Sequence, residues 1–118
     1  MQQFFEHHID GVTVVAATGA IDMLTAPHLQ EVMNAALDRD PARLILDMTD
    51  VDFLGSAGMQ VLMVTRNNLG PGTRFAVVAD GPATSRPLKI TGVADVVEMF
   101  PTLELALMNV TEEASSSR

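Results

Sequence analysis

Two short apolar runs at the start of the chain predict a β-hairpin. Residues 12–18 (VTVVAAT) are β-branched and apolar, which favours a strand that Gly19 closes. Residues 3–9 alternate more weakly between two sets of side chains, and they favour a second strand. Asp10-Gly11 separates the two runs and is typical of a tight two-residue turn. The chain is therefore expected to begin with two antiparallel strands.

Helix-like and strand-like patterns alternate along the rest of the chain. Thr25-Ala26-Pro27 indicates a helix start, because threonine can cap a helix and proline is tolerated in its first turn. Apolar residues then recur at helical spacing as far as Leu37, and Asp38 to Pro41 ends the helix. By the same criteria we expect strands at 43–48, 74–79 and 95–99, and helices at 57–69, within 82–91 and at 102–109.

The order β-β-α-β-α-β-α-β-α predicts an α/β fold. Strands that alternate with short helices imply a mostly parallel sheet, here with an antiparallel N-terminal β-hairpin. We expect a mixed sheet of four to five strands, with about four helices packed mainly on one face. One domain is expected over residues 1–110, followed by a flexible polar C-terminal tail at residues 111–118 (TEEASSSR).

Composition narrows the class of partner. The chain has 118 residues, of which 47% are hydrophobic, and its 7 Lys+Arg against 15 Asp+Glu give a net charge of -8. Such a charge repels nucleic acid and anionic membranes and attracts a partner with a basic face. The chain contains no cysteine, and its sequence contains neither a signal peptide nor an apolar run of membrane-spanning length. We therefore expect a cytoplasmic protein with no nucleic-acid partner and no membrane insertion.

The histidines and serines do not form an enzyme-like pattern. His7 and His8 are adjacent and would point to opposite faces of a strand, while His28 is distant in sequence. No spacing matches a known set of metal ligands. The sequence around Ser56, Gly-Ser-Ala-Gly, is not the Gly-x-Ser-x-Gly of a nucleophile elbow. We expect no enzyme activity, no cofactor and no metal site.

The most informative segment runs from Leu44 to Met63. A buried strand (LILDM) leads through a polar link (TDVD) and the apolar pair Phe53-Leu54 into Gly55-Ser56-Ala57-Gly58, where a helix begins. Gly55 permits a sharp turn or a positive φ, and Ser56 occupies the expected N-cap position. Gly58 in the first turn would leave the helix start open to an approaching group.

Ser56 has two compatible interpretations, a helix cap and a phosphorylation site. Serine is among the favoured N-cap residues. A helix N-terminus also carries free N–H groups and a partial positive charge, so it tolerates a phosphate. A phosphate adds about -1.5 to -2 charges, which would change the surface without unfolding the domain.

The stretch LILDMTDVDFLGSAGMQVL resembles the signature of anti-sigma factor antagonists, the bacterial members of the STAS domain family. The segments GAIDMLTAPHL and SRPLKITGVADVVEMF are similar to two further parts of that family, and the resemblance covers roughly residues 3–108. In the family's Asp-Ser-(Ser/Thr)-Gly-Leu motif, the serine after the Asp is phosphorylated, and it corresponds to Ser56. Gly55, Ala57 and Met59 replace the motif's Asp, second Ser/Thr and Leu, and Ala20 replaces an upstream Glu.

The resemblance implies a protein that binds an anti-sigma factor of the serine-kinase type and so releases a sigma factor. Phosphorylation of Ser56 by that kinase would abolish binding, and a phosphatase would restore it. The implied partner-binding residues are Asp22, Met23, Thr25, Gly55, Ser56, Ala57, Gly58 and Met59.

Three matters stay open at the level of the sequence. The chain is alternatively a stand-alone STAS module, either an accessory subunit of a transporter or a scaffold or ligand sensor, with Ser56 only a cap. The replacements at Gly55 and Ala57 also allow an antagonist that binds without a switch. The oligomeric state is either a monomer or a weak dimer.

Overall fold

The chain begins with the hairpin that Asp10-Gly11 predicts. In this computed structural model, which describes residues 2–116, β1 (Phe4–Ile9) pairs antiparallel with β2 (Val12–Ile21). Both turn residues have positive φ, 52° at Asp10 and 81° at Gly11. This conformation is the one that a two-residue type I′ turn requires, and it places Ile9 opposite Val12.

The rest of the sheet is parallel, as the alternation of strands and helices predicts. The strand order is β1-β2-β3-β4-β5, and β3 (Arg43–Leu54), β4 (Arg74–Val78) and β5 (Glu98–Phe100) run parallel to β2. The connections carry α1 (Ala26–Leu37), α2 (Ser56–Asn67) and α3 (Ser85–Ile90), and the last of them also contains a 3₁₀ turn at Val93–Asp95. The chain then continues into α4 (Leu103–Ser116).

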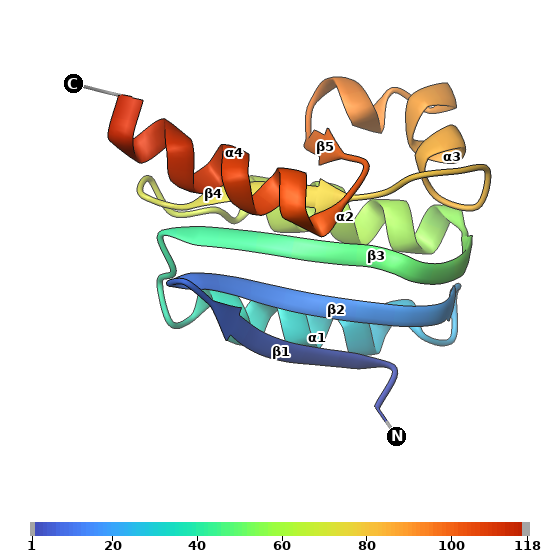
Figure 1. Cartoon of the computed structure of the whole chain (residues 1–118). Helices are drawn as coiled ribbons and strands as arrows, with labels where there is room; N and C mark the ends of the chain where they lie inside the picture. Colours follow the sequence, from blue (N-terminus) through green and yellow to red (C-terminus); the bar gives the residue numbers. More distant parts are fainter. Residues whose placement is uncertain (1, 117–118) are drawn as a thin grey trace.

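The helices lie mainly on one face of the sheet, as expected. β3 points Leu44 and Leu46 to one side, where they are buried with residues of α1, α2 and α3. Its intervening Ile45 points to the other side and is buried with Ala106 and Val110 of α4. The sheet is therefore covered by α4 on one face and by the other helices on the opposite face (Figure 1).

The strands β2 and β3 are longer than the sequence pattern predicts. Gly19 does not close β2: its φ of 71° is accommodated where the register between β2 and β3 shifts, and the strand continues to Ile21. The polar residues at 49–52 do not form a separate link, because β3 continues through them with Val51 buried and Asp50 exposed. The C-terminal ends of these two long strands lead into α1 and α2.

Two further boundaries differ near the C-terminus. The last strand lies at Glu98–Phe100 and not at 95–99, because Val93–Asp95 forms a 3₁₀ turn. The last helix continues to Ser116, past the predicted end at 109. Of the predicted tail at 111–118, residues 117–118 lie outside the described residues. Within residues 2–116, we find no helix with the length and hydropathy needed to cross a membrane.

Candidate partner-docking surface

The carboxyl ends of β2 and β3 bring the predicted site residues together. Ile21 lies opposite Leu54 in the parallel register, and the N–H of Gly55 donates a hydrogen bond to the carbonyl of Ile21 at 2.9 Å. Asp22 therefore follows β2 at the same end of the sheet at which Ser56 follows β3. The two predicted groups, residues 22–25 and residues 55–59, form neighbouring parts of one end of the molecule.

Ser56 is the first residue of α2 and its side chain is exposed. The N-cap is Gly55, with φ -88° and ψ 178°, so the prediction of Ser56 as the cap is wrong. Of the two conformations that Gly55 permits, the structure shows a turn without a positive φ. Within residues 2–116 the Ser56 hydroxyl has no hydrogen-bond partner. The turn into α2 is made by extended backbone at Gly55, and this leaves the serine hydroxyl accessible at the positive end of the helix.

Gly58 faces inward and does not open the helix start to a partner. It is buried, and a Cβ placed on it would lie 2.6 Å from both Ile21 Cγ2 and Leu54 Cδ1. The glycine lets the first turn of α2 pack directly on the ends of β2 and β3. The prediction of an uncovered backbone at Gly58 is therefore wrong, and this residue supports the surface from beneath.

The loop before α1 is held by a small polar network. Asp22 Oδ1 accepts hydrogen bonds from the N–H groups of Leu24 (3.0 Å) and Thr25 (3.1 Å). In return, the N–H of Asp22 donates to the Thr25 hydroxyl at 2.9 Å. This arrangement satisfies backbone donors ahead of the helix and fixes the loop. Asp22 thus has a structural role as a turn former, and its predicted contact with a partner remains a hypothesis.

Three large apolar side chains on this end of the molecule are exposed to solvent, and we call them the apolar rim: Met23, Leu24 and Phe53. Their exposed fractions are 80%, 88% and 53%. The Phe53 ring lies beside Gly55, since a Cβ at that position would be 3.2 Å from Phe53 Cε2. Large apolar residues exposed at one end of a molecule are candidates for an interaction surface.

The sequence analysis missed Leu24 and Phe53. One signal was present for Leu24: Met23-Leu24 forms an apolar pair between a strand end and a helix cap, where a tight loop has no interior in which to bury both. Phe53 gave no such signal, because Phe53-Leu54 looked like a buried pair. In fact only Leu54 is buried, since successive side chains of a strand point to opposite sides.

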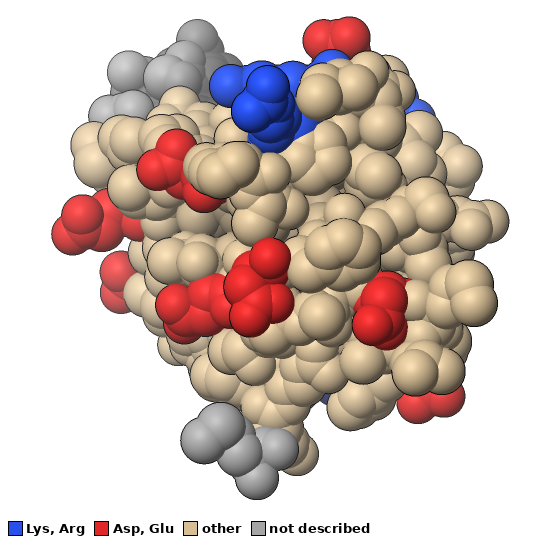
Figure 2. Space-filling view, turned by 90° about the vertical axis from the view of Figure 1, so that its right-hand side faces the viewer, with Lys and Arg blue, Asp and Glu red and all other residues tan. Residues whose placement is uncertain are grey.

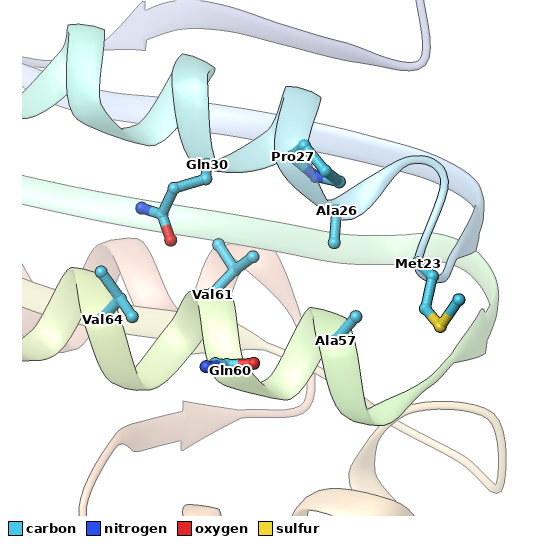
Figure 3. Close-up of a pocket in the computed structure, with 8 residues that line it drawn as sticks. All are labelled: Met23, Ala26, Pro27, Gln30, Ala57, Gln60, Val61 and Val64. Carbon is cyan, nitrogen blue, oxygen red and sulfur yellow. The ribbon is translucent and has the colours of Figure 1, made fainter.

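A shallow groove between α1 and α2 begins at this surface (Figure 3). Its volume is about 300 Å³, and it is lined by Met23, Ala26, Pro27, Gln30, Ala57, Gln60, Val61 and Val64. Figure 3 shows the α1 side chains facing those of α2, with Met23 at the loop end next to Ala57. Met59 lies outside the groove: its side chain is half-buried against the core, and its Sδ accepts from the Thr91 hydroxyl at 3.4 Å.

The charges at this end of the molecule are mostly negative. Figure 2 views the right-hand side of Figure 1, where acidic side chains are spread over the surface and the main basic cluster lies along the upper edge. Asp52 is exposed near the end of β3, while Asp47 accepts hydrogen bonds from the N–H and the hydroxyl of Thr49. Such a surface complements a partner with basic residues.

Two of the histidines contact other side chains of the chain. His28 packs its ring against Phe4 with the centroids 5.4 Å apart, and His8 pairs with Glu6 at 3.2 Å. Among the side chains that the structure describes, no three His, Cys, Asp or Glu are grouped so that they could hold a metal ion. The arrangement at the ends of β2 and β3 is suited to docking, with one accessible hydroxyl among apolar side chains.

Known proteins resemble this chain over most of its length. A family model described as the STAS domain matches residues 6–106. The anti-sigma-F factor antagonist RsfB of Mycobacterium tuberculosis is 37% identical over 101 residues, which cover 86% of this chain and 83% of the relative. A crystal structure of an anti-sigma factor antagonist from Mycobacterium paratuberculosis matches with TM-score 0.89 and 42% identity, covering 92% of each chain.

A more distant likeness concerns the fold alone. The Bacillus cell fate determinant SpoIIAA, solved in its phosphorylated form, matches with TM-score 0.67 and 15% identity. The match covers 91% of this chain and 98% of that one.

Proposed function

We propose that this chain, which belongs to the STAS domain family, acts as an anti-sigma factor antagonist controlled by phosphorylation at Ser56. In its unphosphorylated form it binds an anti-sigma factor of the serine-kinase type, so that a sigma factor is released. The observation that carries the proposal is the exposed Ser56 hydroxyl, which lies next to the apolar rim at one end of the sheet. The protein acts in the cytoplasm.

Binding would bury the apolar rim and the mouth of the groove. Met23 and Leu24 are almost fully exposed in the isolated chain, so covering them removes a large apolar area from water. The loop that carries them is held by Asp22 and Thr25, so little ordering entropy is lost on docking. The acidic surroundings favour a partner that presents Lys or Arg at the edge of the contact.

Phosphorylation would act on the contact and leave the fold intact. The serine-kinase partner would hold ATP and Mg²⁺; the γ-phosphoryl group passes to Ser56 Oγ as its bond to the β-phosphate oxygen breaks, ADP leaves, and the hydroxyl proton goes to a base of the partner. The phosphate lies at the N-terminus of α2, where the free N–H groups tolerate it. In the complex the same charge would be desolvated among apolar side chains, which drives dissociation. A phosphatase then restores the binding form.

The test combines intact-mass spectrometry with binding measurements. Wild type, Ser56→Ala and Ser56→Asp are incubated with ATP, Mg²⁺ and a candidate anti-sigma factor of the serine-kinase type from the same organism. We expect one phosphate on the wild type and none on either variant. We expect Ser56→Asp to bind at least about 100-fold more weakly, since a like or unpaired charge in an interface costs several kcal/mol.

Ser85 supplies a matched control. It is the first residue of α3, as Ser56 is of α2, but its hydroxyl donates to the Gly81 carbonyl at 3.0 Å. Ser85→Asp should keep wild-type binding. If the unmodified protein binds and gains no phosphate, the antagonist role holds without the switch. If none of the proteins binds, the antagonist role itself is wrong and the scaffold or transporter-subunit alternative is favoured.

A second arm tests the apolar rim. Leu24→Ser should weaken binding about tenfold or more while leaving stability unchanged, because the side chain has almost no contacts to lose within the chain. Leu105→Ser, an equivalent change at a 40% exposed residue of α4, is the control and should bind as the wild type does. Equal affinities for the two variants would show that the rim is not part of the contact.

A further inference from the structure

The two edges of the sheet differ in how they are protected. The outer strand β5 has three residues, and short edge strands offer little to a second sheet. The other edge strand, β1, has six residues with the sequence FFEHHI and an unbroken register with β2. It contains no proline, no lysine and no bulge, which are the devices that usually protect an edge. Its Phe5 is 43% exposed.

The backbone groups that point outward from β1 follow from one hydrogen bond. The N–H of Thr18 donates to the carbonyl of Gln3 at 3.0 Å, so Gln3 and Thr18 form a hydrogen-bonded pair. Such pairs recur at every second residue of an antiparallel ladder. Phe5, His7 and Ile9 therefore direct their N–H and C=O groups to β2, while Phe4, Glu6 and His8 direct theirs away from the sheet.

We infer that this edge is a homodimer interface, in which β1 of one copy pairs antiparallel with β1 of a second copy about a two-fold axis at His7. In this register Glu6 of each copy lies opposite His8 of the other, and their outward N–H and C=O groups are hydrogen-bonded. On the opposite face, Phe5 of each copy lies beside Ile9 of the other. The two edges thus complement each other, with a carboxylate facing an imidazole on one face of the sheet and apolar side chains facing each other on the other face.

The competing registers are less favourable. A two-fold axis at Glu6 would place two carboxylates directly opposite each other, which is destabilising. An axis at Phe5 would leave Ile9 and His8 without partners. Within one copy Glu6 already contacts His8, at 3.2 Å, and Arg39, so in the dimer His8 of the second copy would join or replace these partners. The axis at His7 is therefore the register that the sequence of β1 selects.

The dimer is expected to be weak and independent of the docking surface. Six residues give a small interface, and each copy carries a net charge of -8, so association should need micromolar protein and moderate salt. β1 lies at the edge of the sheet, separated from β3 and the start of α2 by β2. Loss of the dimer and loss of binding at Ser56 can thus be measured separately.

Engineered cysteines test the register, because the chain has none of its own. In the proposed dimer the two copies of residue 7 face each other in a non-hydrogen-bonded pair with Cα atoms about 4.5 Å apart, within disulfide range. The two copies of residue 5 are offset by four residues, about 13 Å, which no disulfide spans. The same offset separates the two copies of residue 9. His7→Cys should therefore cross-link under mild oxidation, while Phe5→Cys and Ile9→Cys alone should not.

The mixture of Phe5→Cys with Ile9→Cys should cross-link, since these positions face each other across the axis. If His7→Cys stays uncross-linked, or if all three single variants cross-link equally, the proposed register is wrong.

A proline variant tests the edge itself by sedimentation. His8→Pro removes an outward N–H without removing a bond to β2, whereas His8→Ala keeps that N–H. We expect His8→Pro to be monomeric and His8→Ala to retain a weakened dimer, with circular dichroism unchanged in both. A His8→Pro protein that associates as the wild type does, or a wild type that is monomeric up to millimolar concentration, would overturn the proposal.

Discussion

The starts of α1 and α2 lie at the same end of the sheet and are built in opposite ways. Ahead of α1, the side chains of Asp22 and Thr25 bond to the loop backbone and fix it. Ahead of α2, no side chain caps the helix, and Gly58 holds the first turn by packing against Ile21 and Leu54. The start of α1 is stabilised by hydrogen bonds of its loop side chains, and the start of α2 by packing of its buried side. As a result, the exposed side chains at the start of α2 are not needed to hold that helix in place.

This difference explains how one residue can change its chemistry without endangering the fold. Ser56 lies on α2, where stability comes from the buried side of the helix. The hydroxyl at the start of α1, that of Thr25, is itself a member of the network with Asp22, so its modification would weaken the loop. The loop before α1, held by its own hydrogen bonds, presents Met23 and Leu24 at the same end of the sheet as the modifiable Ser56.

The largest expected effect on stability comes from disrupting the packing of Gly58 between α2 and the ends of β2 and β3. Gly58→Val should lower the free energy of unfolding by roughly 2–3 kcal/mol, because the added carbons overlap Ile21 and Leu54. Urea unfolding measures the change. Gly72→Val is the matched control, since no atom lies within 4 Å of a Cβ at that position, and it should change stability by less than about 0.5 kcal/mol. Equal losses for the two variants would contradict the packing role of Gly58.

A smaller effect should follow from removing the network at α1. Asp22→Ala deletes the acceptor of two backbone N–H groups and should cost about 1 kcal/mol, as the loss of a helix cap does. Asp52→Ala makes the same change at an exposed carboxylate near the end of β3, and it should be close to neutral. The comparison is made by thermal unfolding of both variants. If Asp22→Ala is as stable as Asp52→Ala, the network does not hold the loop.

The smallest effect, with the opposite sign, is expected at Ser56. Ser56→Asp should raise stability by about 0.5 kcal/mol, because a carboxylate at a helix N-terminus is stabilised by the helix dipole and α2 has no acidic residue in its first turn. Ser56→Ala should leave stability unchanged. Urea unfolding in low salt resolves the difference. If the free energy of unfolding falls by more than about 1 kcal/mol in either variant, the Ser56 hydroxyl contributes to the stability of the fold.

Local sequence patterns predicted the element order well. Asp10-Gly11 determined the hairpin, and the alternation of strands and helices determined the mixed sheet, because both depend on neighbouring residues. The resemblance of the segment around Ser56 to a known family pointed to one end of the sheet, and the role of that surface in binding stays a prediction. All the residues expected there do lie at the ends of β2 and β3, although Gly58 lies beneath the surface and Met59 beside it.

What the sequence could not supply were the tertiary reasons for individual residues. The polar run at 49–52 looked like a link, and only the pairing of β3 with β2 makes it a strand. Gly58 looked like an opening because its tight fit depends on Ile21, a residue 37 positions earlier in the sequence. Ser56 looked like a cap, yet a shift of one residue makes Gly55 the cap. The first two errors concern contacts between segments that are distant in the chain, and the third is a one-residue shift of a helix boundary.

The hydrogen bond from Gly55 to Ile21 has a consequence for cells that hold several proteins of this fold. It joins the loop after β2 to the loop after β3, so the surface that a partner recognises is a composite of two segments about thirty residues apart. Exchanging residues 55–59 alone between two paralogues would place the serine segment of one protein beside the loop after β2 of the other. Transfer of partner choice should require residues 21–25 and 53–59 to move together, as one inherited unit.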